Sequence, residues 1–323
     1  MSPHGHDHGH PANGSASGPG HQRRLALVLA LTGGYAVAEG VGGWLTGSLA
    51  LLADAGHMLT DSLGLAMAVA AVWFAKRPAT AAKTYGFYRA EILAALVNGL
   101  LLLGIAVGIL REAWERLSES HSVDVGPMIA IAVGGLVVNV AGLRLLHATS
   151  GESLNSRAAY LEVFADLLGS VAVIVAGVVM LATGWLHVDA VVSAALALFI
   201  IPRTVGLLRS VVDVLLEAAP RGINLGDVEN AMLAVPGVAS VHDLHVWTIT
   251  SGFVAMSGHV ESRGRRSEDV LHDLRAMLTE RFNIPHVTLQ VESEEHANDG
   301  ACCEIDPRCL VVGALAERHA GGH

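Results

Sequence analysis

The chain has 323 residues, a net charge of -10 and a mean hydropathy of +0.49, with 52% hydrophobic but only 15% charged residues. Soluble domains carry about 25% charged residues, so this composition excludes a single water-soluble globule. The acidic balance also argues against nucleic acid as a partner, because that role needs a basic surface.

The first segment, residues 1–22, is polar and rich in glycine, with His4, His6, His8 and His10 at alternate positions. It lacks the short apolar run and small-residue cleavage site of a secretory signal. We expect this segment to stay attached, to be disordered and to collect metal ions loosely.

Six apolar stretches follow, and each is long enough as a helix to cross about 30 Å of hydrocarbon. A continuous helix satisfies its own backbone in lipid, so the pattern predicts a six-helix transmembrane domain over residues 23–209. The stretches are approximately 25–44, 48–74, 92–110, 127–146, 158–182 and 188–208.

Lys and Arg gather before the first stretch, between the second and third, around the connection of the fourth and fifth, and around the end of the sixth. The alternate connections carry only Arg111 and Arg116. This bias predicts that both termini are cytoplasmic in a multi-pass protein of the cell inner membrane.

Residues 210–293 are less apolar and show shorter periods. They predict a helix at 227–234, strands at 240–250 and 253–261, a helix at 267–282 and a strand at 286–292. The order αββαβ suggests a small cytoplasmic ferredoxin-like domain. Residues 294–323 are expected to be a flexible tail containing cysteine and histidine.

Ionisable residues recur inside two of the apolar stretches. His57 and Asp61 stand four residues apart in the second, and Glu162 and Asp166 stand four apart in the fifth. Residues at this spacing share a helix face. Charged groups in lipid cost several kcal/mol unless they are paired or coordinated, so these residues mark a functional site. The two pairs together could surround one divalent ion at about 2.0 to 2.2 Å, although each residue alone could instead bond a neighbouring helix.

Five further polar residues give weaker signals. Glu39 and Asp189 lie near predicted outer ends, where we expect them to face water. Asn98 and Asn139 favour hydrogen bonds between helices. Asp54 lies one turn before His57 and suits a partner that supports the ligands or lines the ion's path.

Four motifs in order give the chain a family resemblance: residues 53–61 (ADAGHMLTD), 85–95 (YGFYRAEILAA), 154–160 (LNSRAAY) and 242–247 (HDLHVW). The chain resembles the cation diffusion facilitator family of metal efflux transporters, in its bacterial zinc/cobalt/cadmium branch. The resemblance runs from about Arg23 to Glu292 and implies a Y- or V-shaped homodimer in the lipid bilayer.

The resemblance also implies a transport site built from His57, Asp61, Glu162 and Asp166. Zinc-selective members usually have His where this chain has Glu162. The substitution gives one nitrogen and three carboxylates, which is a harder donor set. Zinc is the first expectation, and Co²⁺, Cd²⁺, Fe²⁺ and Mn²⁺ stay open.

A second metal site follows from the same resemblance, at the cytoplasmic interface of the dimer. We expect His245 and His286 to be strand-surface residues. A tail site at Cys302 and Cys303, with Cys309 nearby, is balanced against free thiols. The residues implied for the interface site are His242, His259 and Glu292.

These features predict a Zn²⁺/H⁺ antiporter that exports metal from the cytoplasm by alternating access and is not an enzyme. Protons are expected to couple because the imidazole must be neutral and the carboxylates ionised to hold metal. A membrane-anchored metal sensor is the main alternative. An intramembrane metallohydrolase is disfavoured, because no His-Glu-x-x-His motif is present.

Overall fold

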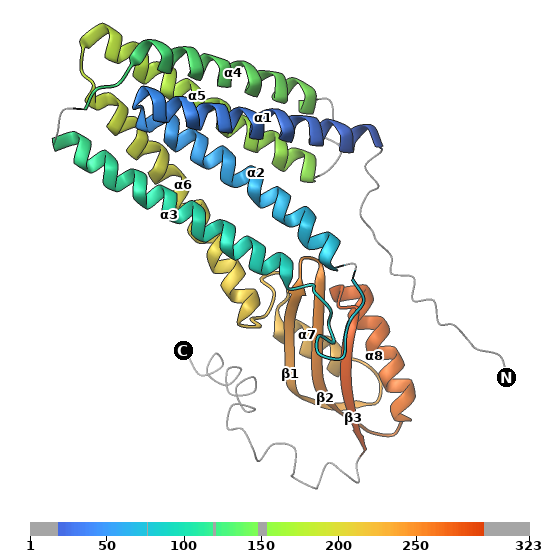
Figure 1. Cartoon of the computed structure of the whole chain (residues 1–323). Coiled ribbons are helices and arrows are strands. Elements are labelled where there is room, and N and C mark those ends of the chain that lie inside the picture. The colour runs from blue at the N-terminus through green and yellow to red at the C-terminus, as the bar shows by residue number, and fades with distance from the viewer. Residues whose placement is uncertain (1–18, 76, 119–120, 148–153, 294–323) are drawn as a thin grey trace. The chain divides into compact units, whose positions relative to one another are not determined.

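The computed structural model describes residues 19–75, 77–118, 121–147 and 154–293 (Figure 1). The chain forms two compact units: one contains the chain up to Ala66 together with Asn98–Val205, and the other contains Met67–Val97 and the chain from Gly206 onward.

Six long helices lead the chain, and each contains one of the six apolar stretches. Four of the described helices, α3 to α6, are long and apolar enough to cross a membrane. Large apolar side chains such as Trp44 and Phe199 are exposed on these helices, as expected for a lipid-facing surface. The six are α1 (Pro19–Thr46), α2 (Leu49–Ala75), α3 (Ala90–Ser118), α4 (Val125–His147), α5 (Leu154–Thr183) and α6 (His187–Leu215).

The helices extend past the apolar stretches at several ends. In particular, α3 continues through Arg111 and Arg116, so these residues lie on a helix and not in a connection as predicted. Arg111 and Arg116 pair with Glu115 and Glu112 at i, i+4 spacing, which favours the additional helical turns.

Small residues bring the helices of the first unit close together. Gly142 on α4 faces Val28 of α1 and Val163 of α5, and a Cβ there would lie 3.4 and 3.2 Å from those side chains. The Tyr35 hydroxyl on α1 donates a hydrogen bond to the Ile131 carbonyl on α4. Figure 1 shows α1, α4 and α5 side by side, the arrangement that glycine-rich faces permit in membranes.

The C-terminal elements follow the predicted order αββαβ. The helix α8 has the predicted bounds, whereas α7 begins two residues early because the Asn224 side chain accepts a hydrogen bond from the Gly226 N–H at 2.9 Å and caps it. The elements are α7 (Leu225–Leu233), β1 (Val238–Thr250), β2 (Phe253–Ser262), α8 (Ser267–Phe282) and β3 (His286–Ser293).

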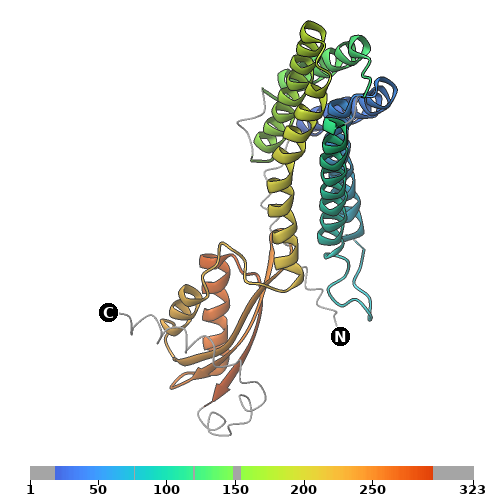
Figure 2. The same cartoon turned by 90° about the vertical axis from the view of Figure 1, so that its left-hand side faces the viewer.

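The three strands form a small mixed sheet in the order β1-β2-β3. β1 and β2 are antiparallel around a turn in which Gly252 adopts a φ of +75°, and β3 is parallel to β2. Figures 1 and 2 show α7 and α8 on one face of this sheet. Their buried side chains meet those of the strands there. The buried core comprises Val228, Met232, Leu244, Val246, Met256, Val260, Val270, Leu274, Leu278, Ile284 and Val287.

Candidate metal centres

The first cluster lies between α2 and α5 in the first unit. His57 Nε2 lies 3.5 Å from Asp61 Oδ2 on the same helix and 4.0 Å from Asp166 Oδ1 on α5. The i, i+4 spacing on α2 gives both of its side chains one direction, and α5 supplies the third. Donor atoms from all three residues lie within 4.8 Å of one another.

This geometry suits a cation more than a structural hydrogen-bond network. His57 Nδ1, Asp61 Oδ2 and Asp166 Oδ1 are buried and have no hydrogen-bond partner among the described residues. Buried polar atoms are normally paired, and three unpaired ones gathered in one cluster could together coordinate a cation. The ligands of a tetrahedral zinc ion lie about 3.3 to 3.6 Å apart, so movements of less than about 1 Å would close these atoms around one ion.

Glu162, the fourth predicted ligand, is placed differently. Both of its carboxylate oxygens accept hydrogen bonds from Arg203 Nη2 on α6, at 3.0 and 2.8 Å. Glu162 still interacts electrostatically with His57, but it is not part of the three-residue cluster. Arg203 is therefore a residue at this site that the sequence did not single out.

Polar side chains on three helices continue from the cluster. Ser170 Oγ on α5 donates to the Asp166 carbonyl at 3.2 Å and lies 3.5 Å from Asp54 Oδ2 on α2. Asn139 on α4 donates to Ser170 Oγ at 3.4 Å, so the predicted interhelical role of Asn139 is confirmed. These contacts make Asp54 a neighbour of the ligand-bearing turn of α5, consistent with the expected supporting role.

Asp189 does not face water, and that prediction is wrong. The residue is 1% exposed, and its carboxylate accepts hydrogen bonds from Ser48 Oγ at 2.7 Å, Leu49 N at 2.7 Å and Ala50 N at 3.2 Å. Arg116 Nη1 lies 3.6 Å from its Oδ2. Asp189 on α6 therefore caps the first turn of α2, where backbone N–H groups lack partners within the helix.

Glu39 also differs from its prediction. It is 0% exposed, and neither carboxylate oxygen has a hydrogen-bond partner among the residues that the structure describes. The packing of α1 against α4 encloses it, because Glu39 Oε1 lies 3.7 Å from the position that a Cβ on Gly135 would take.

For Asn98, the side-chain oxygen Oδ1 is buried and has no hydrogen-bond partner in the described chain. The predicted hydrogen bond between helices is therefore not made through that atom.

The second cluster lies on the sheet face away from α7 and α8. His242 on β1 pairs with His259 on β2, and their rings lie 5.2 Å apart. Glu292 on β3 reaches both: its Oε1 is 2.8 Å from His259 Nδ1, and its Oε2 is 3.9 Å from His242 Nε2. The donor atoms of these three residues lie within 4.8 Å of one another.

A β-bulge gives His242 this direction. The register shifts between His242 and His245, and Asp243 adopts a φ of +52°, a conformation that Asp tolerates better than most residues. Val241 and Leu244 both pack on the helix-covered face, so two residues instead of one separate them and His242 is turned to the open face. Asp243 also lies 3.9 Å from His259 Nε2, a contact that the sequence did not predict.

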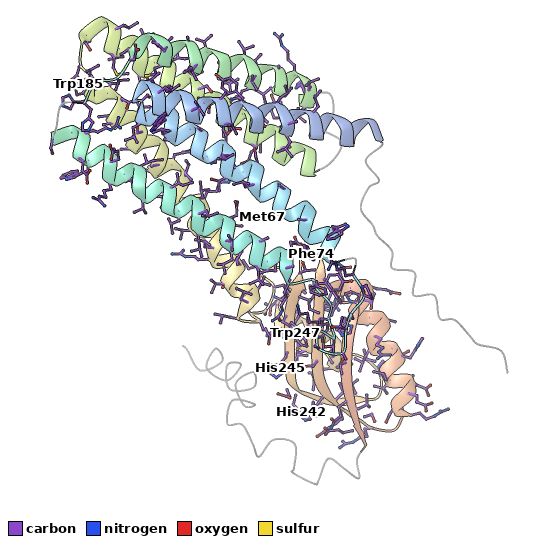
Figure 3. The ribbon with its side chains drawn as sticks, in the orientation of Figure 1. Met67, Phe74, Trp185, His242, His245 and Trp247 are labelled. Atoms are coloured by element: carbon purple, nitrogen blue, oxygen red, sulfur yellow. The ribbon has the colours of Figure 1, made fainter. Side chains whose placement is uncertain are left out.

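His242, His245 and Trp247 follow one another along β1 in Figure 3. The His245 side chain is 64% exposed and bonds Asp243 at 2.9 Å, as expected for a strand-surface residue. His286 is likewise exposed on β3.

Within the second unit, the α2–α3 connection packs against the hairpin of β1 and β2. The ring of Tyr88 in the connection lies 5.5 Å from that of Phe253. The carboxylate of Glu91, in the first turn of α3, accepts hydrogen bonds from Thr250 and Ser251 at 2.6 and 2.8 Å. Arg89 pairs with Glu217 after α6 at 2.6 Å. The residues around the α2–α3 connection therefore contact the C-terminal elements of the same unit.

The N-terminal histidines and the tail cysteines Cys302, Cys303 and Cys309 lie outside the described residues. The predicted loose collection of metal at the N-terminus and the possible tail site are therefore untested by the structure.

Comparison with known proteins matches the chain to two family models. Residues 25–216 match the cation efflux transmembrane domain, and residues 220–294 match the cation efflux protein cytoplasmic domain. The metal cation efflux system protein CzcD of Cupriavidus metallidurans is 46% identical over 290 residues, covering 89% of this chain and 90% of the relative.

Two further relatives and one solved structure extend the comparison. The zinc transporter ZitB of Escherichia coli is 40% identical, covering 86% of this chain and 91% of ZitB. The cadmium, cobalt and zinc/H(+)-K(+) antiporter of Bacillus subtilis is 37% identical, covering 92% of this chain and 94% of the antiporter. The metal-bound C-terminal domain of CzcD from Cupriavidus metallidurans is 43% identical, covering 22% of this chain and 99% of that chain with a TM-score of 0.21.

Proposed function

Because the chain belongs to the cation efflux family, we propose that it exports divalent metal cations from the cytoplasm, with Zn²⁺ as the main substrate and protons as the counter-ions. The observation that carries this proposal is the cluster of unpaired buried donors at His57, Asp61 and Asp166. One imidazole and two carboxylates form a donor set that zinc accepts readily.

The transport site comprises His57, Asp61, Glu162 and Asp166. The donor atoms of His57, Asp61 and Asp166 lie within 4.8 Å of one another, which supports their assignment as ligands, and Glu162 borders them and pairs with Arg203. Charged groups this deep in helices of a membrane protein are retained for function by default.

Export proceeds by exchange at this one site. The ion enters from the cytoplasm, the helices rearrange so that the site opens outward, and protons replace the ion. His57 must be neutral to donate a lone pair, and the carboxylates must be ionised, so proton binding and metal binding compete for the same atoms. Metal release and proton uptake are then one event.

The membrane arrangement has six spans, α1 to α6, with both termini in the cytoplasm of a bacterial inner-membrane protein. The Lys and Arg bias supports this orientation, and so does the packing of the α2–α3 connection against the C-terminal domain. We assign residues 1–22 to an N-terminal segment whose last four residues, from Pro19, begin α1; residues 23–209 to the membrane domain; 210–293 to the cytoplasmic domain; and 294–323 to the tail.

The cytoplasmic domain has a ferredoxin-like topology and forms the contact between two protomers of a homodimer. A regulatory divalent ion binds at His242, His259 and Glu292 on the open face of the sheet, where it would link β1, β2 and β3. This binding draws the two cytoplasmic domains together and favours transport.

The test uses the full-length protein in proteoliposomes with an imposed pH gradient. We expect Zn²⁺ flux that depends on the gradient and is abolished by His57→Ala and by Asp166→Asn, which remove a ligand without altering the helix surface elsewhere. Leu63→Ala on the same helix, at an exposed position, is the matched control. Flux that persists in both ligand variants would refute the assigned site.

A membrane-anchored metal sensor is the second candidate, because the cytoplasmic cluster alone could bind metal. A sensor would bind Zn²⁺ through His242 and His259 but move none across the bilayer. Metal flux by the native protein separates the two functions directly.

A further inference from the structure

Arg203 and Glu162 form an ion pair beside the first cluster, and no such arginine–carboxylate hydrogen bond is found at the other carboxylates of that cluster among the described residues. Both oxygens of Glu162 bond one guanidinium nitrogen, at 3.0 and 2.8 Å. By contrast, Asp61 and Asp166 each present a buried oxygen with no partner among the described residues. Of the three carboxylates of the predicted site, Glu162 is thus the one that accepts hydrogen bonds from Arg203, although it also lies next to Asp61.

The ion pair between Arg203 and Glu162 affects the number of protein ligands that are available to the transported ion. An arginine side chain stays protonated in proteins, so Arg203, whose side chain is 62% exposed, competes with any metal for the oxygens of Glu162. Glu162 lies one helical turn before Asp166 and could otherwise turn to the cluster. Its side chain is 29% exposed, compared with 7% for Asp166, which also places it at the margin of the buried site.

We propose that Arg203 is a specificity-determining positioning residue, which holds Glu162 out of the ligand set so that the transported ion meets one imidazole and two carboxylates. This inference rests on the proposed transport site. It means that Glu in place of His at position 162 does not harden the site while Arg203 is present. A set of three protein ligands suits Zn²⁺, which accepts low coordination numbers, better than Mn²⁺, which favours more oxygen ligands.

Removing Arg203 frees a third carboxylate next to the ion. The site then gains both a negative charge and a hard oxygen donor, and its preference shifts toward Mn²⁺. Changes to residues that orient ligands commonly alter metal affinity about 10- to 100-fold. We therefore expect Arg203→Ala to raise the ratio of Mn²⁺ to Zn²⁺ affinity about tenfold or more.

The experiment measures binding and flux for Zn²⁺, Co²⁺, Cd²⁺ and Mn²⁺ with the full-length protein, by calorimetry in detergent and by flux in proteoliposomes. The double variant Arg203→Ala with Glu162→Gln removes both charges, so it should return the Mn²⁺ to Zn²⁺ ratio to near the native value. Arg203→Lys keeps the charge but loses the planar guanidinium, and should give an intermediate ratio. Arg209→Ala, on the same helix, is the matched control.

A purely structural role for Arg203 predicts a different pattern. In that case Arg203→Ala lowers affinity for all four metals equally, and Glu162→Gln has no influence on the ratio in the double variant. Equal loss, or a ratio unchanged in Arg203→Ala, would overturn the inference. If Arg203→Ala does not fold, Glu162→Gln decides alone: it should weaken Zn²⁺ binding far less than Asp166→Asn does, and equal weakening would refute the proposal.

Failure of the proposed function is recognised separately. It would appear as native protein that moves none of the four metals, or as His57→Ala that moves them normally. Failure of the present inference leaves native transport intact and concerns only the selectivity of the Arg203 variants.

Discussion

Asp189→Ala should destabilise the membrane domain strongly, although Asp189 lies outside both metal clusters. Its carboxylate accepts three hydrogen bonds at the start of α2, from Ser48, Leu49 and Ala50. It also balances the charge of Arg116, whose side chain is only 14% exposed. The substitution removes all of these interactions at once and leaves the partners buried.

The size of the expected loss in the free energy of unfolding follows from the groups that lose a hydrogen-bond partner. Loss of a helix cap costs about 1 kcal/mol, and a buried donor left unpaired costs about 1 to 3 kcal/mol. Arg116 keeps its bonds to Gly47 and Glu112, which limits the penalty from its own charge. We expect a total loss of about 3 to 5 kcal/mol for Asp189→Ala, and about 1 to 3 kcal/mol for Asp189→Asn, whose amide oxygen can still accept from the helix.

The assay is reversible unfolding in mixed detergent micelles, followed by circular dichroism. Asp213→Ala on the same helix is the matched control: its pair with Arg221 is exposed, so removal should cost less than about 1 kcal/mol. If Asp189→Ala and Asp213→Ala unfold at the same detergent fraction, the assignment of Asp189 as the cap of α2 is wrong.

Three further predictions concern other parts of the chain. Glu39→Leu should be at least as stable as the native protein in the same unfolding assay, because it replaces a fully buried carboxyl that has no partner among the described residues. A decrease of more than about 1 kcal/mol in the free energy of unfolding would contradict this prediction. Asp243→Val should weaken Zn²⁺ binding at the cytoplasmic cluster about 5- to 30-fold by calorimetry, because a left-handed backbone costs a branched residue about 1 to 2 kcal/mol. Equal binding by Asp243→Val and Asp243→Gly would show that the bulge does not position His242. Glu91→Ala should increase tryptic cleavage of the α2–α3 connection, because it removes the two hydrogen bonds to the hairpin; an unchanged cleavage rate would mean that these bonds do not hold the connection.

Local periodicity predicted the elements that depend on neighbours in sequence. The bounds of α8 follow from its apolar spacing and from Asn283 after its last turn, which adopts a φ of +55°. His57 and Asp61 could be assigned to one helix face because four residues are about one turn. Such features require no knowledge of where the other helices lie.

Features that join distant segments could not be read in the same way. Arg203 and Glu162 are 41 positions apart, and nothing in either apolar stretch indicates that α5 and α6 bring them together. Asp189 appeared to face water because its position near a helix end is compatible with exposure, and only the packing of α6 against the start of α2 buries it. The Asp243 bulge was also hidden, since a one-residue insertion in a strand leaves its composition unchanged.

The acids of the membrane helices differ in which groups surround their carboxylates. Asp189 has Arg116 and the start of α2, and Glu162 has Arg203. Glu39 has no such partner in the described chain, but it is not in either group of three metal-ligating side chains. At Asp61 and Asp166, buried oxygens without a hydrogen-bond partner among the described residues come together with the imidazole of His57, which is the arrangement expected of a site that takes up a divalent cation.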